Sequence, residues 1–430
     1  MNTKLLKQKI LDLAIRGKLS QQLKSDGTAA DLLKEICDRT QEKTSLRAKR
    51  GNPSPQTIIP LDKNEVPFEI PANWEWVRLG DVGALKGGKR VPAGKTMTTE
   101  PTSHIYIRIT DMREGTIYDD DLHYVTDEIY EVIKNYTISK NDLYITIAGT
   151  IGRVGLVPDL FDGMNLTENA LKITNVIPDK KYLMYALQSG FVQDYFESTY
   201  HQVAMPKLSL TNASKALLPL PPLAEQQRIV AKIEEAFAEI DAIEKNKELL
   251  KTHIKQTRQK ILDLAIHGKL VPQNKSDEPA SVLLERITRD NPHYEKIEDE
   301  PFEIPENWAW CRLGNICDKL IDGDHNPPKG LDYTTEYMML SSRNINDNGI
   351  VDLENVRYLS KDTFEEENLR TKLEKGDILF TSVGSLGRSC VFSGDGKYCF
   401  QRSVSVIHTN IYNKYLKYFF DSNYYQKYIV

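Results

Sequence analysis

The chain has 430 residues, of which 40% are hydrophobic and 27% are charged. This composition is that of a folded globular protein and excludes wholesale disorder, and the length predicts roughly three structural units. The formal net charge of −5 excludes a protein that coats nucleic acid through bulk charge. Any nucleic-acid role therefore requires basic groups that are locally concentrated.

Cysteine spacing, the N-terminus and hydropathy exclude several other classes. The five cysteines show no C-x-x-C spacing and the eight histidines form no metal-ligand pattern, so neither a zinc site nor a disulfide framework is predicted. The basic N-terminus MNTKLLKQKILDLAIRG is interrupted by Asp12 and Arg16 and lacks the apolar core of a signal peptide. Because no run of about 18 apolar residues occurs, we expect a cytoplasmic protein without a membrane span.

The first 66 residues predict helices followed by a linker. Residues 3–16 place apolar side chains at helical spacing among lysines and arginines, and residues 29–37 predict a second, short helix. Residues 38–66 combine basic residues with glycine and prolines, which is typical of a mobile linker. We therefore assign residues 1–66 to an N-terminal helical segment and linker.

Residues 67–218 are expected to form one α/β domain. Short β-branched runs alternate there with glycine turns, and a helix is predicted near residues 181–197. The sequence LLPLPPLAEQQ ends this stretch, and its prolines give an extended approach to a helix, at whose start a proline costs no hydrogen bond. We expect the helix to span residues 223–266 within a spacer segment at 219–270.

The predicted long helix carries a coiled-coil seam. Twelve positions spaced alternately by three and four residues hold nine apolar side chains, and such a stripe requires a partner helix. One helix over 223–266 would be about 66 Å long, close to the roughly 68 Å of two turns of B-DNA. A plain packing helix is the alternative. The predicted helix–helix interface consists of Ile229, Ile233, Ile240, Ile243, Leu250, Ile254, Ile261 and Leu264.

The chain contains two related copies of one unit. Residues 8–19, QKILDLAIRGKL, recur at 259–270 with eleven of twelve identities. Residues 67–82, PFEIPANWEWVRLGDV, recur at 301–316 with eleven of sixteen. Weaker echoes follow in the same order, at 139–155 and 374–390 and at 181–196 and 414–429.

The framing sequences of the two copies are nearly identical, whereas their interiors have diverged, which indicates two related but distinct ligands. The predicted fold is therefore α/β, with two similar globular domains separated by a long coiled-coil-type helix and preceded by a short helical segment. A linker helix and loop at 271–300 lead to the second domain at 301–430. That copy ends early, because Val430 aligns with Glu197, and we expect either a cut or a naturally shortened chain.

These motifs resemble those of the specificity subunits of type I restriction–modification systems. The resemblance rests on WxWxRLG after PFEIP, on LPLPPLAEQ leading into a long helix, and on QKILDLAIxGKL closing that helix. It covers essentially the whole chain. The one departure is that a second LPLPPLAEQ and its helix are absent.

The resemblance implies a non-catalytic subunit that binds double-stranded DNA. It implies two target-recognition domains that each read one half of a split site, and paired long helices that set their spacing and dock two modification subunits. Those methyltransferase partners are expected to use S-adenosylmethionine to methylate adenine, and restriction motor–nuclease subunits are expected to use ATP. No cofactor is expected in this chain itself.

Three apparent enzyme or metal motifs fail on spacing or composition. The segment GKRVPAGKT has five residues between its glycines where a phosphate-binding loop needs four. The tetrapeptide at 326–329, NPPK, resembles that of amino-methyltransferases but has Lys329 where an aromatic ring would stack on the flipped base. The acidic run 119–121 is interpreted as a solvated loop. We therefore predict no catalytic site and no metal site.

Candidate DNA contacts are basic or amide side chains that differ between the copies. In the first domain four basic residues lie on a glycine-rich stretch with no acid between them, and such a loop can approach phosphates closely. A solvated charged loop is the alternative. These residues are Lys86, Lys89, Arg90 and Lys95, and Lys329 in the loop GDHNPPKG is a candidate in the second domain.

Two aligned polar segments provide further candidates. Arginine can bind guanine and asparagine can bind adenine in a bidentate manner, so these segments are candidates for reading bases. A simple polar turn is the alternative. The residues are Thr110, Asp111 and Arg113 in the first copy and Arg343, Asn344 and Asn346 in the second.

Other candidates match in both copies and are interpreted as shared parts. The turns Thr150–Arg153 and Ser385–Arg388 lie between predicted strands, and their arginines suit phosphate positioning better than base reading. Trp74, Trp76, Trp308 and Trp310 also match and are interpreted as scaffold. Residues 245–260 carry six Lys or Arg side chains against one acid, and can face DNA, modification subunits or solvent.

We predict a DNA sequence-specificity subunit and keep three alternatives. The chain can be a shortened or silent specificity protein that acts only by pairing or recombination, which an in-frame continuation downstream would oppose. It can be a coiled-coil scaffold that binds no DNA, in which case charge reversal at Lys89 and Arg90 leaves function untouched. A methyltransferase would require that the isolated chain bind S-adenosylmethionine.

Overall fold

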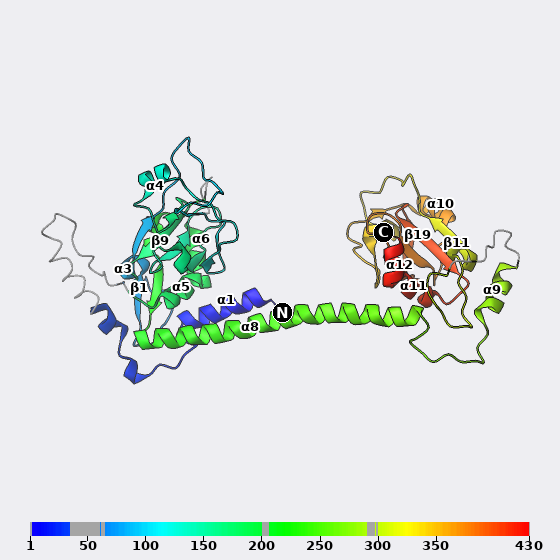
Figure 1. The fold of residues 1–430 in the computed structure, drawn as a ribbon, viewed down its shortest axis with the longest axis horizontal. Helices are drawn as coiled ribbons and strands as arrows, with labels where there is room; N and C mark the ends of the chain where they lie inside the picture. Colours follow the sequence, from blue (N-terminus) through cyan, green and yellow to red (C-terminus); the bar gives the residue numbers. More distant parts are fainter. Residues whose placement is uncertain are drawn as a thin grey trace. The chain divides into compact units, whose positions relative to one another are not determined.

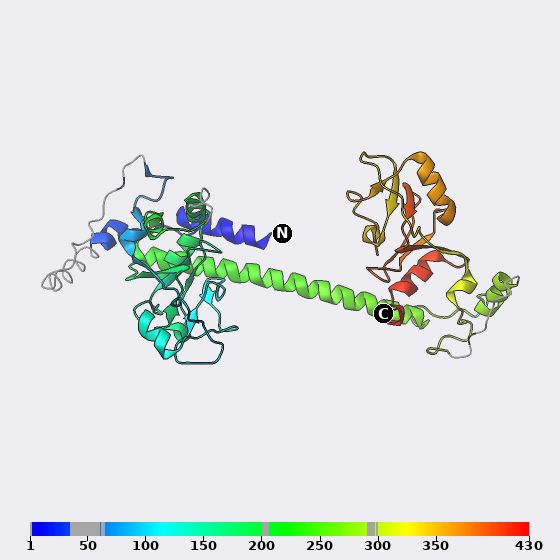
Figure 2. The ribbon, with the colours of Figure 1, turned by 90° about the horizontal axis from the view of Figure 1, so that it is seen from above.

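The structure is a computed structural model that describes residues 2–34, 61, 65–199, 206–289, 297 and 300–429. The chain divides into two units, Met1–Asn246 and Lys247–Val430. Figures 1 and 2 show strands and helices mixed in each unit, and helix α8 (Leu223–Ile266) begins in the first unit and ends in the second. The expected fold class is confirmed. Among the described residues, none of the helices is both long and apolar enough to cross a membrane.

The first unit combines short strands with helices. Its strands are β1 (Glu75–Arg78), β2 (Ala84–Gly87), β3 (Tyr106–Ile107), β4 (Met112–Arg113), β5 (Thr116–Ile117), β6 (Leu143–Thr146), β7 (Val154–Leu156), β8 (Asn165–Leu166), β9 (Ala170–Thr174) and β10 (Leu217–Leu220). Its helices before α8 are α1 (Thr3–Ile15), α3 (Leu79–Val82), α4 (Asp127–Ile133), α5 (Lys180–Gln188), α6 (Gly190–Ser198) and α7 (Leu210–Ser214).

An antiparallel sheet in the order β2-β9-β6-β7 organises the first unit. Strand β6 is buried on both faces, with Leu143 and Ile145 in one apolar cluster and Tyr144 in another. A short, uninterrupted apolar run is what a strand covered on both faces requires. The sheet therefore lies between two cores.

The second unit repeats this plan. Its strands are β11 (Cys317–Asp322), β12 (Tyr337–Leu340), β13 (Ile345–Asn346), β14 (Gly349–Ile350), β15 (Arg357–Tyr358), β16 (Ile378–Thr381), β17 (Ser389–Val391), β18 (Lys397–Phe400) and β19 (Val404–Thr409), and its helices after α8 are α9 (Ala280–Thr288), α10 (Lys361–Thr371), α11 (Asn413–Asp421) and α12 (Asn423–Tyr428). The main sheet has the order β11-β19-β16-β17 and is also antiparallel. Ile378 and Leu379 of its strand β16 again face two different cores.

The predicted N-terminal and central helices are confirmed. Helix α1 begins after Asn2, whose side chain accepts a hydrogen bond from the Leu5 backbone N–H at 3.1 Å. Helix α8 begins at Leu223, directly after two prolines, and spans 44 residues. Residues 29–34 are helical. The rest of the predicted 29–37 helix, most of the predicted linker at 38–66, and residues 290–296, 298 and 299 of the 271–300 segment lie outside the described residues.

The single helix predicted near 181–197 is wrong, because two helices occupy this stretch. Ser189 separates α5 from α6, and its backbone is extended (φ −62°, ψ 152°). The Ser189 hydroxyl donates to the Ala186 carbonyl at 2.6 Å, which closes the first helix. Ser422 separates α11 from α12 in the same way, with a 2.6 Å bond to Phe419. The apolar pattern continues through the break, so hydrophobic periodicity alone does not reveal it.

Candidate nucleic-acid interface

The tryptophan motifs pack inside each unit. Trp74 is 3% exposed. The rings of Trp76 and Phe68 meet edge to face with centroids 4.8 Å apart, and Trp310 and Phe302 repeat this geometry at 4.8 Å. These contacts support the scaffold interpretation, because rings packed in this way are not presented for stacking on bases.

The turn between β6 and β7 presents Arg153 to solvent on a rigid base. The Thr146 hydroxyl donates to the Thr150 carbonyl and accepts from the Arg153 backbone N–H at 3.0 Å. Gly152 has φ +87°, in the region that favours glycine, and its carbonyl accepts from Gln193 Nε2 of α6 at 2.9 Å. Arg153 and Thr150 are exposed, as a DNA contact requires.

The turn between β16 and β17 reproduces this arrangement in the second unit. The Thr381 hydroxyl donates to the Ser385 carbonyl and accepts from the Arg388 backbone N–H at 3.0 Å. Gly387 has φ +83°, and its carbonyl accepts from Gln426 Nε2 at 2.8 Å. Arg388 is exposed and Ser385 is half-buried. The two units therefore carry an arginine at the same place on the same hydrogen-bonded frame.

The polar segment of the first unit is closed by an acid. Asp111 is buried, and its carboxylate accepts from the Arg108 backbone N–H at 2.8 Å and from the Arg108 guanidinium at 2.7 Å. Thr110 is exposed beside it. Asp111 therefore shapes the turn, and Thr110 remains available to a ligand.

Arg113 is less free than the sequence indicated. Its guanidinium forms an ion pair with Asp120 and lies 4.0 Å from the centre of the Tyr118 ring. Asp121 is paired with Arg108 at 2.9 Å. The interpretation of residues 119–121 as a merely solvated loop is therefore incomplete, because two of the three acids hold arginines.

Asn344 does not offer an amide edge to a base, which corrects its assignment as a candidate adenine contact. It is 2% exposed, its Oδ1 accepts from the Ser341 backbone N–H at 2.9 Å, and its Nδ2 donates to the Asp352 carbonyl at 2.9 Å. Asn346 is half-buried, and its Oδ1 closes the next turn onto Gly349 N at 3.1 Å. Arg343 is exposed and stays a candidate.

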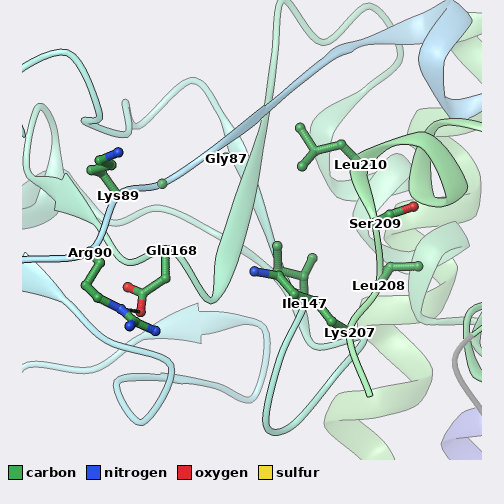
Figure 3. Close-up of a pocket in the computed structure, with 10 residues that line it drawn as sticks. Gly87, Lys89, Arg90, Ile147, Glu168, Lys207, Leu208, Ser209 and Leu210 are labelled. Carbon is green, nitrogen blue, oxygen red and sulfur yellow. Dashed lines mark hydrogen bonds and ion pairs between the residues drawn. The ribbon is translucent and has the colours of Figure 1, made fainter. Parts of the chain in front are cut away.

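The glycine-rich loop after β2 borders a cavity of about 590 Å³ in the first unit. Figure 3 shows Arg90 beside Glu168 at this cavity, and their Nε–Oε1 distance is 2.7 Å. Burial is the largest single influence and raises the pKa of Glu168. The hydrogen bonds from Arg90, Thr167 and the Glu168 backbone, together with the charge of Arg90, outweigh it, so the net shift of the pKa is downward and the carboxylate stays ionised. Lys89 lies on the same rim. The structure thus brings two of the four predicted loop cations together with an acid.

The other predicted basic residues are placed apart from this cavity. Lys86 is exposed on β2, and Lys95 is paired with Glu128 at 2.8 Å. Lys329 is exposed in the second unit, on a loop whose Pro328 carbonyl accepts from Arg357 at 3.0 Å. All three remain predictions.

Residues 71–252 match the family model described as the type I restriction modification DNA specificity domain. Curated relatives are named type I restriction enzyme specificity subunits. The EcoAI specificity subunit of Escherichia coli is 27% identical over 380 residues, which cover 73% of this chain and 62% of that protein. The EcoBI specificity subunit of Escherichia coli is 30% identical over 194 residues, which cover 42% of this chain and 40% of that protein.

The chain is similar to type I restriction enzyme specificity subunits, and the family model covers residues 71–252 of it. The chain spans about three fifths of the length of the first curated relatives that it matches (62% and 63%). A solved structure described as the basis of complex assembly and conformational transition of the type I R-M system is 20% identical, with a TM-score of 0.51, and the match covers 84% of this chain and 81% of that chain. This likeness supports the fold.

The first part of the predicted seam is buried inside the first unit. Ile229, Ile233 and Ile240 lie among the buried residues. Figure 1 shows α1 alongside α8, and Lys7 of α1 is paired with Asp241 of α8 at 2.5 Å. Helix α1 therefore lies along this part of α8, and α5 also contacts it, since Lys181 pairs with Glu234 at 2.6 Å.

The later part of the seam is exposed. Leu250 and Ile254 are 59% and 60% exposed, and Ile243 and Ile261 are also exposed, whereas Leu264 is half-buried. Leu262 and Ile266, near the end of α8, are buried. Within the described residues, no helix covers the exposed positions.

Sequence reasoning missed Glu168, Lys207 and Arg402. Glu168 and Lys207 border the cavity of Figure 3, and Arg402 is exposed in the second unit. Glu168 and Arg402 could have been found from their position, since each follows the end of a short strand by two residues. Among the described residues, no group of three or more His, Cys, Asp or Glu side chains could hold a metal ion.

Proposed function

We propose that this chain is the sequence-specific DNA-binding subunit of a type I restriction–modification complex and that each unit reads one half of a bipartite target. The observation that carries the proposal is the pair of matched frames. Arg153 and Arg388 occupy equivalent exposed turns, while the exposed residues of the neighbouring loops differ between the units. A shared frame with different surface chemistry is what two related but distinct DNA sites require.

The contacts divide into positioning and reading groups. The equivalent arginines Arg153 and Arg388 bind phosphates and set the register of each unit on the duplex. The divergent candidates contact base edges or the sugar–phosphate backbone beside them. These are Lys86, Lys89, Arg90, Lys95, Thr110 and Arg113 in the first unit and Lys329, Arg343 and Asn346 in the second.

The chain is non-catalytic in this proposal and acts through its partners. Modification subunits bring S-adenosylmethionine, and restriction subunits bring ATP. Docking uses the exposed seam of α8 from Ile243 to Ile261, because an apolar stripe of this length is stable only when a partner protein covers it. No cofactor site is proposed within the chain.

The experiment combines the full chain with its modification subunits. We expect adenine methylation within one bipartite sequence, mapped across a genome that carries the gene and compared with a deletion strain. The double variant Lys89→Glu/Arg90→Glu should lose methylation. The matched control is Lys232→Glu, since Lys232 pairs with Glu235 on the surface of α8, and it should retain methylation.

Absence of sequence-selective methylation or binding with cognate subunits would overturn the proposal. A scaffold that binds only protein predicts full partner binding by the Lys89→Glu/Arg90→Glu variant and no steep dependence of DNA affinity on salt. A DNA-binding subunit predicts the steep dependence, because cations that contact phosphates release counterions.

A further inference from the structure

The glycine-rich loop of each unit leaves the main sheet through the same tight contact. A Cβ on Gly88 would lie 2.0 Å from the Thr167 carbonyl oxygen, and a Cβ on Gly323 would lie 2.2 Å from the Phe400 carbonyl oxygen. Only glycine fits at either place, since the neighbouring atoms are backbone. The loops therefore start from equivalent positions beside β8 and β18.

Backbone hydrogen bonds continue the equivalence for one more residue. The Lys89 N–H donates to the Leu166 carbonyl at 2.9 Å, and the Asp324 N–H donates to the Phe400 carbonyl at 2.7 Å. Leu166 and Phe400 are the last residues of β8 and β18. Two residues beyond them lie Glu168 and Arg402, so each side chain stands next to the start of its loop.

The charges at these equivalent positions are exchanged between the units. The first unit has Lys89 and Arg90 on the loop and Glu168 opposite. The second unit has Asp324 on the loop and Arg402 opposite, and the Arg402 N–H donates to the Asp324 carbonyl at 2.8 Å. One frame thus carries its arginine on the loop in one unit and on the strand end in the other.

The pairing of Arg90 leaves a free recognition edge. Its side chain is 78% exposed and is held through Nε by Glu168, which is 23% exposed and also accepts from the Thr167 hydroxyl at 3.1 Å. Neither terminal nitrogen of Arg90 has a partner among the described residues. Two parallel N–H groups are what the O6 and N7 atoms of guanine bind in the major groove. An exposed ion pair contributes little to folding stability, so positioning is the stronger explanation for this contact.

Arg402 also presents a free guanidinium, but no carboxylate in the described part of the second unit holds it as Glu168 holds Arg90. It is exposed, and its guanidinium forms no ion pair with any acid in residues 300–429. Its backbone is fixed on both sides, through the bond to Asp324 and through its carbonyl, which accepts from the Ser382 hydroxyl at 3.2 Å. A long cationic side chain on a fixed backbone is suited to reach a base edge.

We propose that Arg90 reads a guanine in the half-site of the first unit, that Glu168 is its positioning residue, and that Arg402 is the counterpart that reads a guanine for the second unit. The inference rests on the proposed function and deepens it by naming the base. The alternative is that Arg90 and Arg402 contact phosphates only.

The experiment selects bound duplexes from a pool with randomised half-sites, using the full chain with its modification subunits. Arg90→Lys keeps the charge but loses the bidentate edge. It should reduce the preference for guanine at one position of one half-site by roughly 5- to 150-fold, the range expected of a bidentate arginine–guanine pair. The other half-site should not change. Arg402→Lys should reduce the preference for guanine at one position of the other half-site and leave the first half-site unchanged.

Two further variants separate positioning from charge. Glu168→Gln should weaken the same guanine preference as Arg90→Lys without lowering affinity for non-specific DNA, and Glu168→Asp should restore part of the preference. Lys95→Gln is the matched control, because Lys95 lies on the same loop and is paired with Glu128. It removes one charge and should lower affinity for all sequences without altering base preference.

The outcomes distinguish the two proposals. If the wild-type complex selects a bipartite sequence and Arg90→Lys and Arg402→Lys select the same one, both arginines contact phosphates, and the inference is overturned while the proposed function stands. If the wild-type complex selects no sequence, the proposed function fails and the inference fails with it. A change confined to one position of one half-site supports the inference.

Discussion

The two units dock a copy of the same helix end, and the comparison shows what the repeated sequence QKILDLAIxGKL is for. In the first unit this sequence belongs to α1, and Gln8 Nε2 donates to the Gln188 carbonyl at 3.1 Å. In the second unit it forms the end of α8, and Gln259 Nε2 donates to the Asp421 carbonyl at 3.2 Å. The repeat therefore joins a helix to each unit through an equivalent hydrogen bond.

The aromatic contacts beside this repeat also match. Arg16 lies 4.1 Å from the centre of the Phe68 ring, and His267 stacks on Phe302 with centroids 4.1 Å apart. The residue that follows is glycine in both copies, with φ of +67° and +66°. One set of interactions thus serves two places in the chain.

The units differ in the partner of the first tryptophan of the WxW motif, which is Trp74 in the first unit and Trp308 in the second. In the first unit the start of α8 completes the structure, and the Trp74 indole donates to the buried Glu225 carboxylate at 2.9 Å. Glu225 also accepts from Gln22 Nε2 at 2.8 Å. The equivalent Trp308 packs against Tyr415, and its indole N–H has no acceptor among the described residues. Within residues 300–429, Trp308 therefore has no counterpart of the Glu225 contact that Trp74 makes.

The largest expected effect comes from replacing the glycine of the repeated sequence QKILDLAIxGKL in each unit. A Cβ on Gly17 would lie 2.4 Å from Pro71 Cγ, and one on Gly268 would lie 2.3 Å from Pro305 Cγ. Because positive φ and a clash add, Gly17→Ala and Gly268→Ala should each lower the free energy of unfolding of their own unit by about 2–4 kcal/mol. Urea unfolding combined with hydrogen exchange of each unit measures this.

The control for this pair is Gly94→Ala. Gly94 also has positive φ (+76°), but a Cβ there meets nothing within 4 Å. It should therefore cost only the backbone strain of about 1–2 kcal/mol. Equal losses at Gly94 and Gly17 would show that the proline contact is irrelevant to docking.

The next largest effect tests the difference between the contacts of Trp74 and Trp308. Trp74→Phe removes a hydrogen bond to a buried carboxylate and should cost about 1.5–3 kcal/mol beyond the loss of ring area. Trp308 is half-buried, so Trp308→Phe loses less buried area and no hydrogen bond, and it should cost less by at least that amount. Thermal or urea unfolding of the two variants gives the comparison. Identical losses would mean that Glu225 is satisfied by its other donors.

Some elements of the fold could be predicted from the sequence and others could not. The bounds of α8 were predictable, because a heptad pattern of 44 residues and two prolines act over a long stretch. The break at Ser189 was not, since a buried serine leaves the apolar pattern unchanged.

For the site, the equivalent turns at Arg153 and Arg388 were predictable because local glycines fix them. Glu168 was missed since its partner Arg90 is 78 residues away, and Asn344 was misjudged because exposure cannot be deduced from a polar segment.

A smaller effect distinguishes two ion pairs that α8 forms, Arg258–Asp421 in the second unit and Lys7–Asp241 in the first. Arg258 of α8 pairs at 2.9 Å with Asp421, whose side chain is 6% exposed, and Asp421 keeps Lys417 as a second partner. Arg258→Ala should destabilise the second unit by about 1–2 kcal/mol. Lys7→Ala removes a pair whose side chains are 31% and 59% exposed and should cost about 0–1 kcal/mol in the first unit. Hydrogen exchange of α1 and of the end of α8 tests the ranking, and a larger loss for Lys7→Ala would contradict it.

The smallest effect concerns the feature that the units share most closely. If Arg153 and Arg388 each position a phosphate, then Arg153→Gln and Arg388→Gln should each reduce the slope of log affinity against log salt by about one, whatever the DNA sequence. Stability should change little, because both side chains are exposed, although Arg153 also donates to the Met112 carbonyl at 3.1 Å. Titrations at several salt concentrations with target and non-target duplexes measure the slopes. If a variant keeps the wild-type slope but prefers a different base, the arginine that it replaces contacts a base and not a phosphate. The two turns would then read bases although their hydrogen-bonded frames are the same.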